Sequence, residues 1–282
     1  MKFFCIIERM IKNPKKMLNK QLAKETRWLL EEKYNNKPSK KFLADVSRLE
    51  KGEPVDYVIG FTSFLGCHID LSFFPLIPRT ETEFWVERAI AQIKKERKSK
   101  KVQCLDLFSG SGCIGVALFS RIPRITVDFS DIQPSCLRQI KKSIKKNLLG
   151  ASDKCSNVYK SDCFDNIPAK QYDYIFANPP YIARANKQVV QQSVIKWEPH
   201  NALFASNQGL YYIKKIIKDA EVFLKIGGCL FIEFDSHQKK AVGKIIPEEI
   251  YTVTFWKDQF GKWRTVILEK NRMIKHKDEK NL

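Results

Sequence analysis

The sequence predicts an α/β protein with a doubly wound sheet, closed by an antiparallel edge pair and preceded by a helical segment. From residue 102 onward, apolar runs typical of strands alternate with amphipathic runs typical of helices, which is the rhythm of crossover-connected parallel strands. A glycine-rich turn joins the first of these strands to a helix, as in sheets that bind a ligand at their strand ends. Residues 1–53 carry only helical periodicity.

Composition restricts the functional classes that are open to the chain. Hydrophobic residues make up 44% of its 282 residues, which is enough for a packed core. The net charge of +19 favours acidic partners such as nucleic acid or a ribonucleoprotein, although a lysine-rich proteome explains it equally well. No apolar run approaches the ~18 residues of a membrane span. The eight cysteines contain no CxxC pair, so we expect no metal site. Unpaired thiols suit a reducing compartment, so we expect a cytoplasmic protein, and the lack of a long apolar run predicts no membrane contact.

The first element is a helical N-terminal domain, predicted over residues 1–53. Leu18, Leu22 and Leu29 recur at helical spacing. A second helix opens at Ser39, a residue type that caps helix N-termini, and it is stopped by Gly52. Two or three such short helices bury little surface alone, so we expect an appended domain.

Residues 54–77 are predicted to form a β-hairpin that links this domain to the rest of the chain. Apolar residues from Val55 to Phe73 alternate around Gly66, which is typical of a hairpin. The main domain is predicted over 78–270, and it is followed by a basic tail over 271–282.

The main domain begins with a helix after Thr80 and then alternates strands and helices. Its predicted strands are 102–108, 125–129, 157–160, 172–177, 229–234, 251–256 and 263–269. Its predicted helices after these first elements are 114–119, 134–148 and 210–224. Gly227 and Gly228 end the last of these helices, and Gly261 turns the final strand pair.

The helix over 134–148 carries much of the positive charge. One face is apolar, and the other bears five basic residues: Arg138, Lys141, Lys142, Lys145 and Lys146. Such a face is either solvated or a contact surface for RNA or another acidic partner, and the sequence leaves both interpretations open.

The turn after the first main-domain strand has the features of a cofactor loop. It contains Phe108, Ser109, Gly110, Ser111 and Gly112, and it opens a helix. The glycines can take positive φ and let the backbone approach a ligand, while the helix start offers free N–H groups.

Two acidic residues after later strands support an adenosine-containing cofactor. Asp131 lies 21 residues after Gly110, where a carboxylate can accept hydrogen bonds from both hydroxyls of a ribose. Asp162 follows the next strand and could accept from an adenine amino group, with Cys163 and Phe164 against the ring. These residues do not separate NAD from S-adenosylmethionine.

The segment Asn178, Pro179, Pro180 and Tyr181 follows the fourth strand as a stiff loop. Proline fixes φ and removes a donor, so the loop presents acceptors: the Asn178 side-chain oxygen and the Pro179 carbonyl. A planar NH₂ group can donate to both, and Tyr181 can stack on it. Two such acceptors orient a weakly nucleophilic amide or aromatic amine and stabilise positive charge that develops on its nitrogen during methyl transfer.

These residues resemble those of the HemK/PrmC family, N5-glutamine methyltransferases that modify peptide chain release factors. The resemblance covers nearly the whole chain and rests on these segments: Gly52–Gly60, Leu76–Glu83 (LIPRTETE), Asp106–Gly112, Asn178–Ile182 (NPPYI), Glu198-Pro199, Ala202-Leu203, Gly209-Leu210 and Gly227-Gly228. The chain departs from the family where Phe108 replaces a glycine, where Cys163 replaces an aromatic residue, and where Glu233 is followed by Phe-Asp-Ser.

The resemblance implies a class I (Rossmann-like) methyltransferase: a seven-stranded, mainly parallel sheet with a small helical N-terminal domain that helps to grip the release factor. It implies a monomer that transfers methyl from S-adenosylmethionine to the glutamine of a Gly-Gly-Gln motif. Residues 108–112 and Asn178 would contact the cofactor, Asp131 its ribose, and Asp162 with Cys163 its adenine. Asn178 and Pro179 would grip the substrate amide, Pro180 belongs to the same rigid motif, and Tyr181 would pack on the amide.

Three alternatives stay open. One is glutamine methylation of a ribosomal protein, and another is N6-adenine methylation of RNA or DNA, since adenine presents the same two hydrogens. The third is a non-catalytic ribosome-associated binder that keeps the cofactor pocket. The helical N-terminal segment and the lack of a separate target-recognition domain favour a protein substrate over a nucleic acid.

Overall fold

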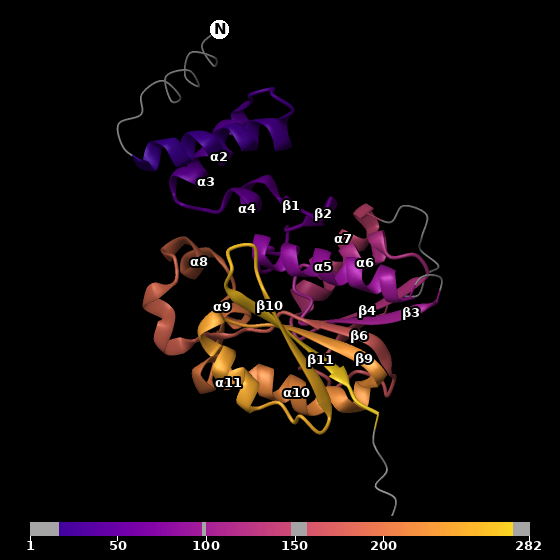
Figure 1. Cartoon of the computed structure of the whole chain (residues 1–282). Coiled ribbons are helices and arrows are strands. Elements are labelled where there is room, and N and C mark those ends of the chain that lie inside the picture. Colours follow the sequence, from indigo (N-terminus) through magenta and orange to yellow (C-terminus); the bar gives the residue numbers. More distant parts are fainter. Residues whose placement is uncertain (1–16, 98–99, 148–156, 273–282) are drawn as a thin grey trace, which may run out of the picture.

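The computed structural model describes residues 17–97, 100–147 and 157–272, and Figure 1 shows two parts joined by a short hairpin. Within these ranges, three helices form the N-terminal part, and the main part is a sheet covered by helices on both faces. The predicted tail over 271–282 lies outside the described residues, except for its first two. None of the helices within these ranges is long and apolar enough to cross a membrane.

The N-terminal part consists of α2 (Met17–Tyr34), α3 (Lys40–Glu50) and α4 (Val55–Ile59). The predicted start of α3 is confirmed, because the Ser39 side chain accepts a hydrogen bond from the Phe42 backbone N–H at 3.2 Å. These helices enclose their own apolar cluster, whose buried members are Leu29, Phe42, Val46, Leu49, Val55 and Val58.

Residues Val55–Ile59 were expected in the hairpin, and that expectation is wrong. Val55 and Val58 are three residues apart, so as a helix they present one face to the N-terminal cluster. A strand would have pointed these two residues to opposite sides. The segment therefore completes the N-terminal core.

The observed hairpin pairs β1 (Phe61–Phe64) with β2 (Cys67–Asp70) around Leu65 and Gly66. Both turn residues have positive φ, 49° and 78°, as a type I′ hairpin turn requires. The hairpin is fastened to the main domain by α7 (Pro134–Asn147), where the Asn147 side chain accepts from the His68 N–H and donates to the His68 carbonyl, both at 2.7 Å.

The main sheet has seven strands in the order β10-β11-β9-β6-β3-β4-β5. The strands are β3 (Val102–Leu107), β4 (Ile125–Asp131), β5 (Val158–Lys160), β6 (Tyr172–Ala177), β9 (Leu224–Glu233), β10 (Tyr251–Lys257) and β11 (Trp263–Lys270). All of them run parallel except β11, which is antiparallel to both neighbours. The predicted α/β fold with a seven-stranded, mainly parallel sheet is confirmed.

Strand β9 begins earlier than expected. Leu224 already pairs with Tyr172 of β6, and Gly227 and Gly228 lie inside the strand. The register against β6 shifts there, and a Cβ on Gly228 would lie only 3.0 Å from the backbone oxygen of Asp173. The two glycines therefore form an irregularity within the strand and do not separate it from the preceding helix.

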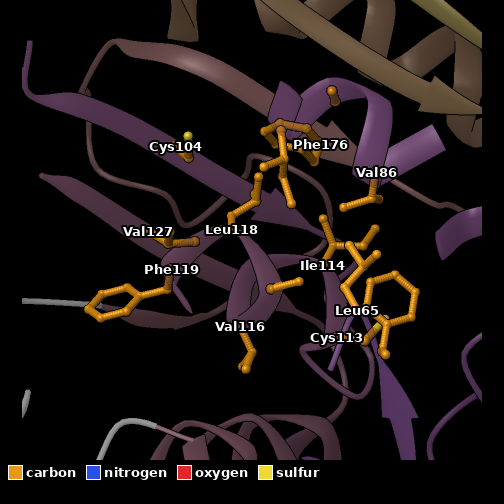
Figure 2. Close-up of a cluster of buried hydrophobic side chains, with 14 of the residues drawn as sticks. Leu65, Val86, Cys104, Cys113, Ile114, Val116, Leu118, Phe119, Val127 and Phe176 are labelled. Carbon is orange, nitrogen blue, oxygen red and sulfur yellow. The ribbon is translucent and has the colours of Figure 1, made fainter. Parts of the chain in front are cut away.

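Helices cover both faces of the sheet (Figure 1). One face carries α5 (Thr80–Arg97), α6 (Cys113–Arg121) and α7 (Pro134–Asn147), and the other carries α10 (Tyr211–Phe223) and α11 (Lys239–Lys244). The strand side chains alternate between two apolar cores. Cys104 and Phe176 enter the core with α5 and α6, shown in Figure 2, whereas Leu105 and Ile175 enter the opposite core.

A long connection leaves β6 and returns to the sheet through α10. It contains β7 (Ile182–Ala183), η1 (Arg184–Val189), α8 (Gln192–Trp197), α9 (His200–Leu203), β8 (Phe204–Ala205) and η2 (Asn207–Gly209). A further short helix, η3 (Ser236–Gln238), follows β9. Both segments lie at the carboxyl ends of the parallel strands, where they help to shape the site.

Candidate functional site

A cavity of about 250 Å³ lies at the carboxyl ends of the parallel strands. Most residues predicted from the sequence line it: Phe108, Ser109, Gly110, Ser111, Asp131, Asp162, Cys163, Asn178 and Pro180. Gly112, Pro179 and Tyr181 adjoin these residues in the chain but are not among the lining residues. The topology explains the convergence, because the ends of β3, β4, β5 and β6 meet at one edge of the sheet.

The glycine loop (Phe108–Gly112) keeps a left-handed turn although it begins with phenylalanine. Phe108 has φ 58°, and its ring packs edge-on against Tyr212 with centroids 5.2 Å apart. Gly110 follows with φ 53°, and a Cβ there would meet only the Phe108 carbonyl oxygen, at 4.0 Å. The Ser109 hydroxyl donates to the Asp106 carbonyl at 2.6 Å, which ties the turn to the end of β3.

Gly112 serves close packing in the structure. It caps α6 with φ 79°, and a Cβ there would lie 3.2 Å from Cγ1 of Ile140 in α7. A glycine therefore lets the start of α6 approach α7, which also supplies Cys136 to the cavity lining.

Asp106 is a buried carboxyl group beneath the loop. One of its oxygens accepts from the Gly115 N–H at 2.9 Å, and the other has no hydrogen-bond partner among the described residues. Burial raises the pKa of this carboxyl to about 7, with a smaller contribution from the charge of Asp131.

Asp131 links the glycine loop to the end of β4. Its Oδ2 accepts from the Gly110 N–H at 2.9 Å, and its Oδ1 accepts from the Gln133 N–H at 2.8 Å. Burial raises the pKa of Asp131, and these backbone donors oppose that effect. Since each carboxylate oxygen has a second lone pair, Asp131 can still accept from ligand hydroxyls.

The segment after β5 behaves only partly as predicted. Asp162 lines the cavity, and one of its carboxylate oxygens lies 3.7 Å from the Lys215 ammonium. Cys163 is buried in the lining with φ 56°. Phe164 is absent from the lining; it stacks on Phe223 in the hydrophobic core with centroids 4.6 Å apart, so the expectation that it faces an adenine ring is wrong.

The NPPY loop (Asn178–Tyr181) is fastened by a carboxylate that the sequence analysis did not select. The Tyr181 hydroxyl donates to Oε1 of Glu233 at 2.9 Å, and the Thr82 hydroxyl donates to its Oε2 at 2.7 Å. The Asn178 side-chain N–H donates in turn to the Thr82 hydroxyl at 3.2 Å. The sequence signal for Glu233 was an acidic residue that ends an otherwise apolar strand.

A second set of contacts holds the backbone of the NPPY loop. The Gln238 side-chain N–H group donates to the Tyr181 carbonyl and to the Gln208 carbonyl, both at 2.9 Å. Gly209, with φ 83°, packs directly against the Tyr181 backbone. In the Gly209-Leu210 pair, which the family resemblance singled out, the glycine thus lets its own backbone lie close to that of the NPPY loop.

The rim of the cavity joins two segments that are distant in sequence. The Arg79 guanidinium lies 2.6 Å from Oε1 of Glu198, and the Ile77 N–H donates to Oε2 at 3.2 Å. Glu198 is buried, whereas the Arg79 side chain is 33% exposed, so the ion pair lies at the boundary between the interior and the solvent. This contact places Pro78 beside Pro199 at the cavity wall.

The arrangement fits an adenosine-containing methyl donor. Residues 108–111 of the glycine loop, Asp131, Asp162 and Asn178 all line the same cavity. Within the described residues, no group of three or more His, Cys, Asp and Glu side chains could hold a metal ion.

Comparisons with known proteins show the family to which the chain belongs. Residues 88–201 match the methyltransferase small domain family model. A Streptococcus pneumoniae protein named release factor glutamine methyltransferase is 34% identical over 245 residues, covering 85% of this chain and 84% of that protein. A Lactococcus lactis protein of the same name is 34% identical, with 80% and 81% covered.

Two solved structures resemble the fold at low sequence identity. One is a ribosomal protein L11 methylase from Lactobacillus delbrueckii, with a TM-score of 0.50, 13% identity, and coverage of 71% of this chain and 83% of that one. The other is the hMettl16 catalytic domain in complex with an RNA hairpin, with a TM-score of 0.54, 17% identity, and 82% and 80% covered. At such identities the likeness shows the class I methyltransferase fold alone.

Proposed function

The chain belongs to the release factor glutamine methyltransferase family, and on that premise we propose that it methylates a peptide chain release factor. The reaction transfers methyl from S-adenosylmethionine to the side-chain amide nitrogen of the glutamine in the Gly-Gly-Gln motif. One observation carries the proposal: a single cavity is lined both by the glycine loop with Asp131 and by Asn178 and Pro180. A cofactor and a planar amide can therefore meet there.

The cofactor is assigned to the part of the cavity that the glycine loop lines with residues 108–111. Backbone groups of Ser109, Gly110 and Ser111 would contact its methionine part, and Gly112 supports them by letting α6 pack closely. Asp131 would accept from the ribose hydroxyls, and Asp162 beside Cys163 from the adenine amino group. When bound, S-adenosylmethionine supplies an electrophilic methyl group on a sulfonium sulfur.

The NPPY loop is assigned to the glutamine side chain. The Asn178 oxygen and the Pro179 carbonyl would accept the two amide hydrogens, and Pro180 would keep the loop rigid. Tyr181, whose hydroxyl is already bound to Glu233, would pack beside the amide. Two fixed acceptors stabilise the positive charge that develops on the nitrogen as its new bond to carbon forms.

The surfaces around the cavity are assigned to the protein substrate. Lys196 of α8 donates to the Lys51 carbonyl at 3.1 Å, so the connection that carries α8 touches the N-terminal helices. We assign release factor recognition to the N-terminal domain, and contact with the ribosome or RNA to the basic face of α7. A cytoplasmic monomer is part of the same proposal.

The test offers S-adenosylmethionine with a release factor, a ribosomal protein or RNA in parallel, and locates the methyl group by mass spectrometry. We expect it on the Gly-Gly-Gln glutamine. Asn178→Ala should lower kcat by about a hundredfold, as loss of a transition-state hydrogen bond does. It should lower affinity for S-adenosylhomocysteine much less, because residues 108–111 and Asp131 keep their places in the cavity. The control is Asn271→Ala, which removes a side-chain amide far along the chain. That amide accepts from the Thr252 hydroxyl, and its removal should leave kcat unchanged.

Other outcomes would replace the proposal. Methyl found only on the ribosomal protein would change the substrate, and methyl found only on adenine would assign the site to nucleic acid. A release factor reaction that Asn178→Ala leaves unchanged would overturn the role of the NPPY loop.

A further inference from the structure

Glu233 is a buried carboxyl group at the end of β9 that is surrounded by donors. Its residue is only 1% exposed. The Trp85 indole N–H and the Thr82 hydroxyl both lie 2.7 Å from Oε2, and the Tyr181 hydroxyl lies 2.9 Å from Oε1. An indole N–H can only donate, and the shared oxygen cannot donate to it. The contacts therefore match a carboxylate that accepts from all three groups.

The direction of these hydrogen bonds fixes the Thr82 hydroxyl. A hydroxyl has one hydrogen, and Thr82 donates it to Glu233. Toward Asn178, which lies 3.2 Å away, Thr82 can therefore only accept. The Asn178 side chain must then present its NH₂ end to Thr82.

An asparagine amide has two ends of opposite polarity. Once the NH₂ end of Asn178 is bound to Thr82, the carbonyl oxygen is the end left for a ligand. Thr82 and Asn178 both line the cavity, so this choice of orientation is made at the cavity wall. The reversed amide would present donors to a substrate group that is itself a donor.

We propose that Glu233 and Thr82 are positioning residues that hold the Asn178 amide with its oxygen toward the substrate, which makes the site selective for a group that donates an N–H. The inference rests on the proposed function for the identity of the substrate. The same carboxyl group binds the Tyr181 hydroxyl, so both ends of the NPPY loop take their orientation from one buried side chain.

Thr82→Val is the most direct variant, because it removes the hydroxyl with little change in shape. Thr82→Ser keeps the hydroxyl, and Thr80→Val makes the same substitution at an exposed residue of the same helix. We expect Thr82→Val to lower kcat about tenfold, which corresponds to one hydrogen bond of about 1.4 kcal/mol. KM for the release factor and affinity for S-adenosylhomocysteine should stay within about twofold, and both controls should resemble the wild type.

A second measurement reports the orientation without any reaction. The side-chain amide signals of Asn178 are assigned in an NMR spectrum by their loss in Asn178→Asp. Thr82→Val should move the hydrogen-bonded amide proton upfield, whereas Thr82→Ser and Thr80→Val should leave it in place. If Thr82→Val does not fold, Glu233→Gln and Glu233→Met replace it. Glutamine keeps an oxygen for Thr82 and should leave the signal unmoved, and methionine should shift it.

The two measurements separate the ways in which the inference can fail. An Asn178 signal that Thr82→Val leaves in place contradicts the orientation, whatever the substrate proves to be. A shifted signal with unchanged kcat contradicts its role in the reaction. A wild-type protein that leaves the release factor unmethylated contradicts the proposed function, while the NMR result still decides the orientation.

Discussion

Gly209 lies so close to Tyr181 that a Cβ at position 209 would overlap the backbone carbonyl of Tyr181. The same position has φ 83°, a conformation that side chains with a Cβ rarely adopt. The Gln238 side chain fills the remaining space and donates to the Tyr181 carbonyl. The end of the NPPY loop is therefore fixed by a residue that has no side chain.

Gly209→Ala should displace the NPPY loop. We expect a loss of unfolding free energy of about 2 kcal/mol or more, since steric overlap adds to the cost of the left-handed backbone, together with a loss of methyl transfer. The control is Gly261→Ala, where φ is 74° but nothing lies within 4 Å of the added Cβ. It should cost only about 1 kcal/mol and retain activity. Denaturant unfolding and kcat measure both, and equal losses at the two positions would contradict the steric argument.

The fold was predictable because its signals are local. A strand needs only a short apolar run, and the Ser39 cap needs only the residue type and the start of a periodic segment. Val55–Ile59 was not predictable in this way. Its apolar spacing suits both a strand and a helix, and packing against residues such as Phe42 decides between them.

The site was predictable where the topology alone brings residues together. Asp131 and Asn178 end parallel strands, so they had to share one edge of the sheet. Thr82 and Glu233 could not be found in this way, because they are 151 residues apart and their hydrogen bond depends on packing. The prediction for Phe164 was wrong for a similar reason, because its stacking partner Phe223 lies on a helix that is distant in sequence.

At position 108, a glycine variant should be more stable than an alanine variant. Phe108 has φ 58°, which costs a residue with a Cβ about 1–2 kcal/mol, and its ring contact with Tyr212 offsets part of that cost. Phe108→Ala removes the ring contact and keeps the strain of the left-handed backbone, whereas Phe108→Gly removes both the ring contact and the strain. We expect the glycine variant to be more stable than the alanine variant by about 1 kcal/mol in denaturant unfolding. The opposite order, which is usual elsewhere, would show that the turn carries no strain.

Asp106 should make the protein less stable as the pH rises. Its pKa is about 7 in the folded protein against 3.8 in the unfolded chain, so the folded state retains a proton that the unfolded state has lost. Between these values stability falls as pH increases, by about 2–4 kcal/mol at most for this group. Asp106→Asn should flatten that part of the profile.

The measurement is the pH slope of the unfolding free energy, because asparagine also leaves a buried N–H group without a partner at every pH. That constant cost displaces the whole curve and does not alter its slope. Wild type and variant with the same slope between pH ~4 and ~7 would show that Asp106 ionises normally.

Asp131→Asn should weaken cofactor binding more than it weakens the fold. The carboxylate accepts from the Gly110 N–H on one oxygen and from the Gln133 N–H on the other. An asparagine must turn its own NH₂ group toward one of these donors, which disturbs the loop and leaves one acceptor fewer for a ligand. Hydrogen bonds to a charged group are worth about 1.5–3 kcal/mol, so the dissociation constant for S-adenosylhomocysteine should rise about ten- to a hundredfold.

Titration calorimetry measures this affinity, and Asp162→Asn is the comparison. The Asp162 side chain is 42% exposed, so water competes for it and its substitution should cost less. A larger loss at Asp162 than at Asp131 would exchange the assignments of these residues within the cavity. Unchanged affinity in both variants would place the cofactor away from the ends of β4 and β5.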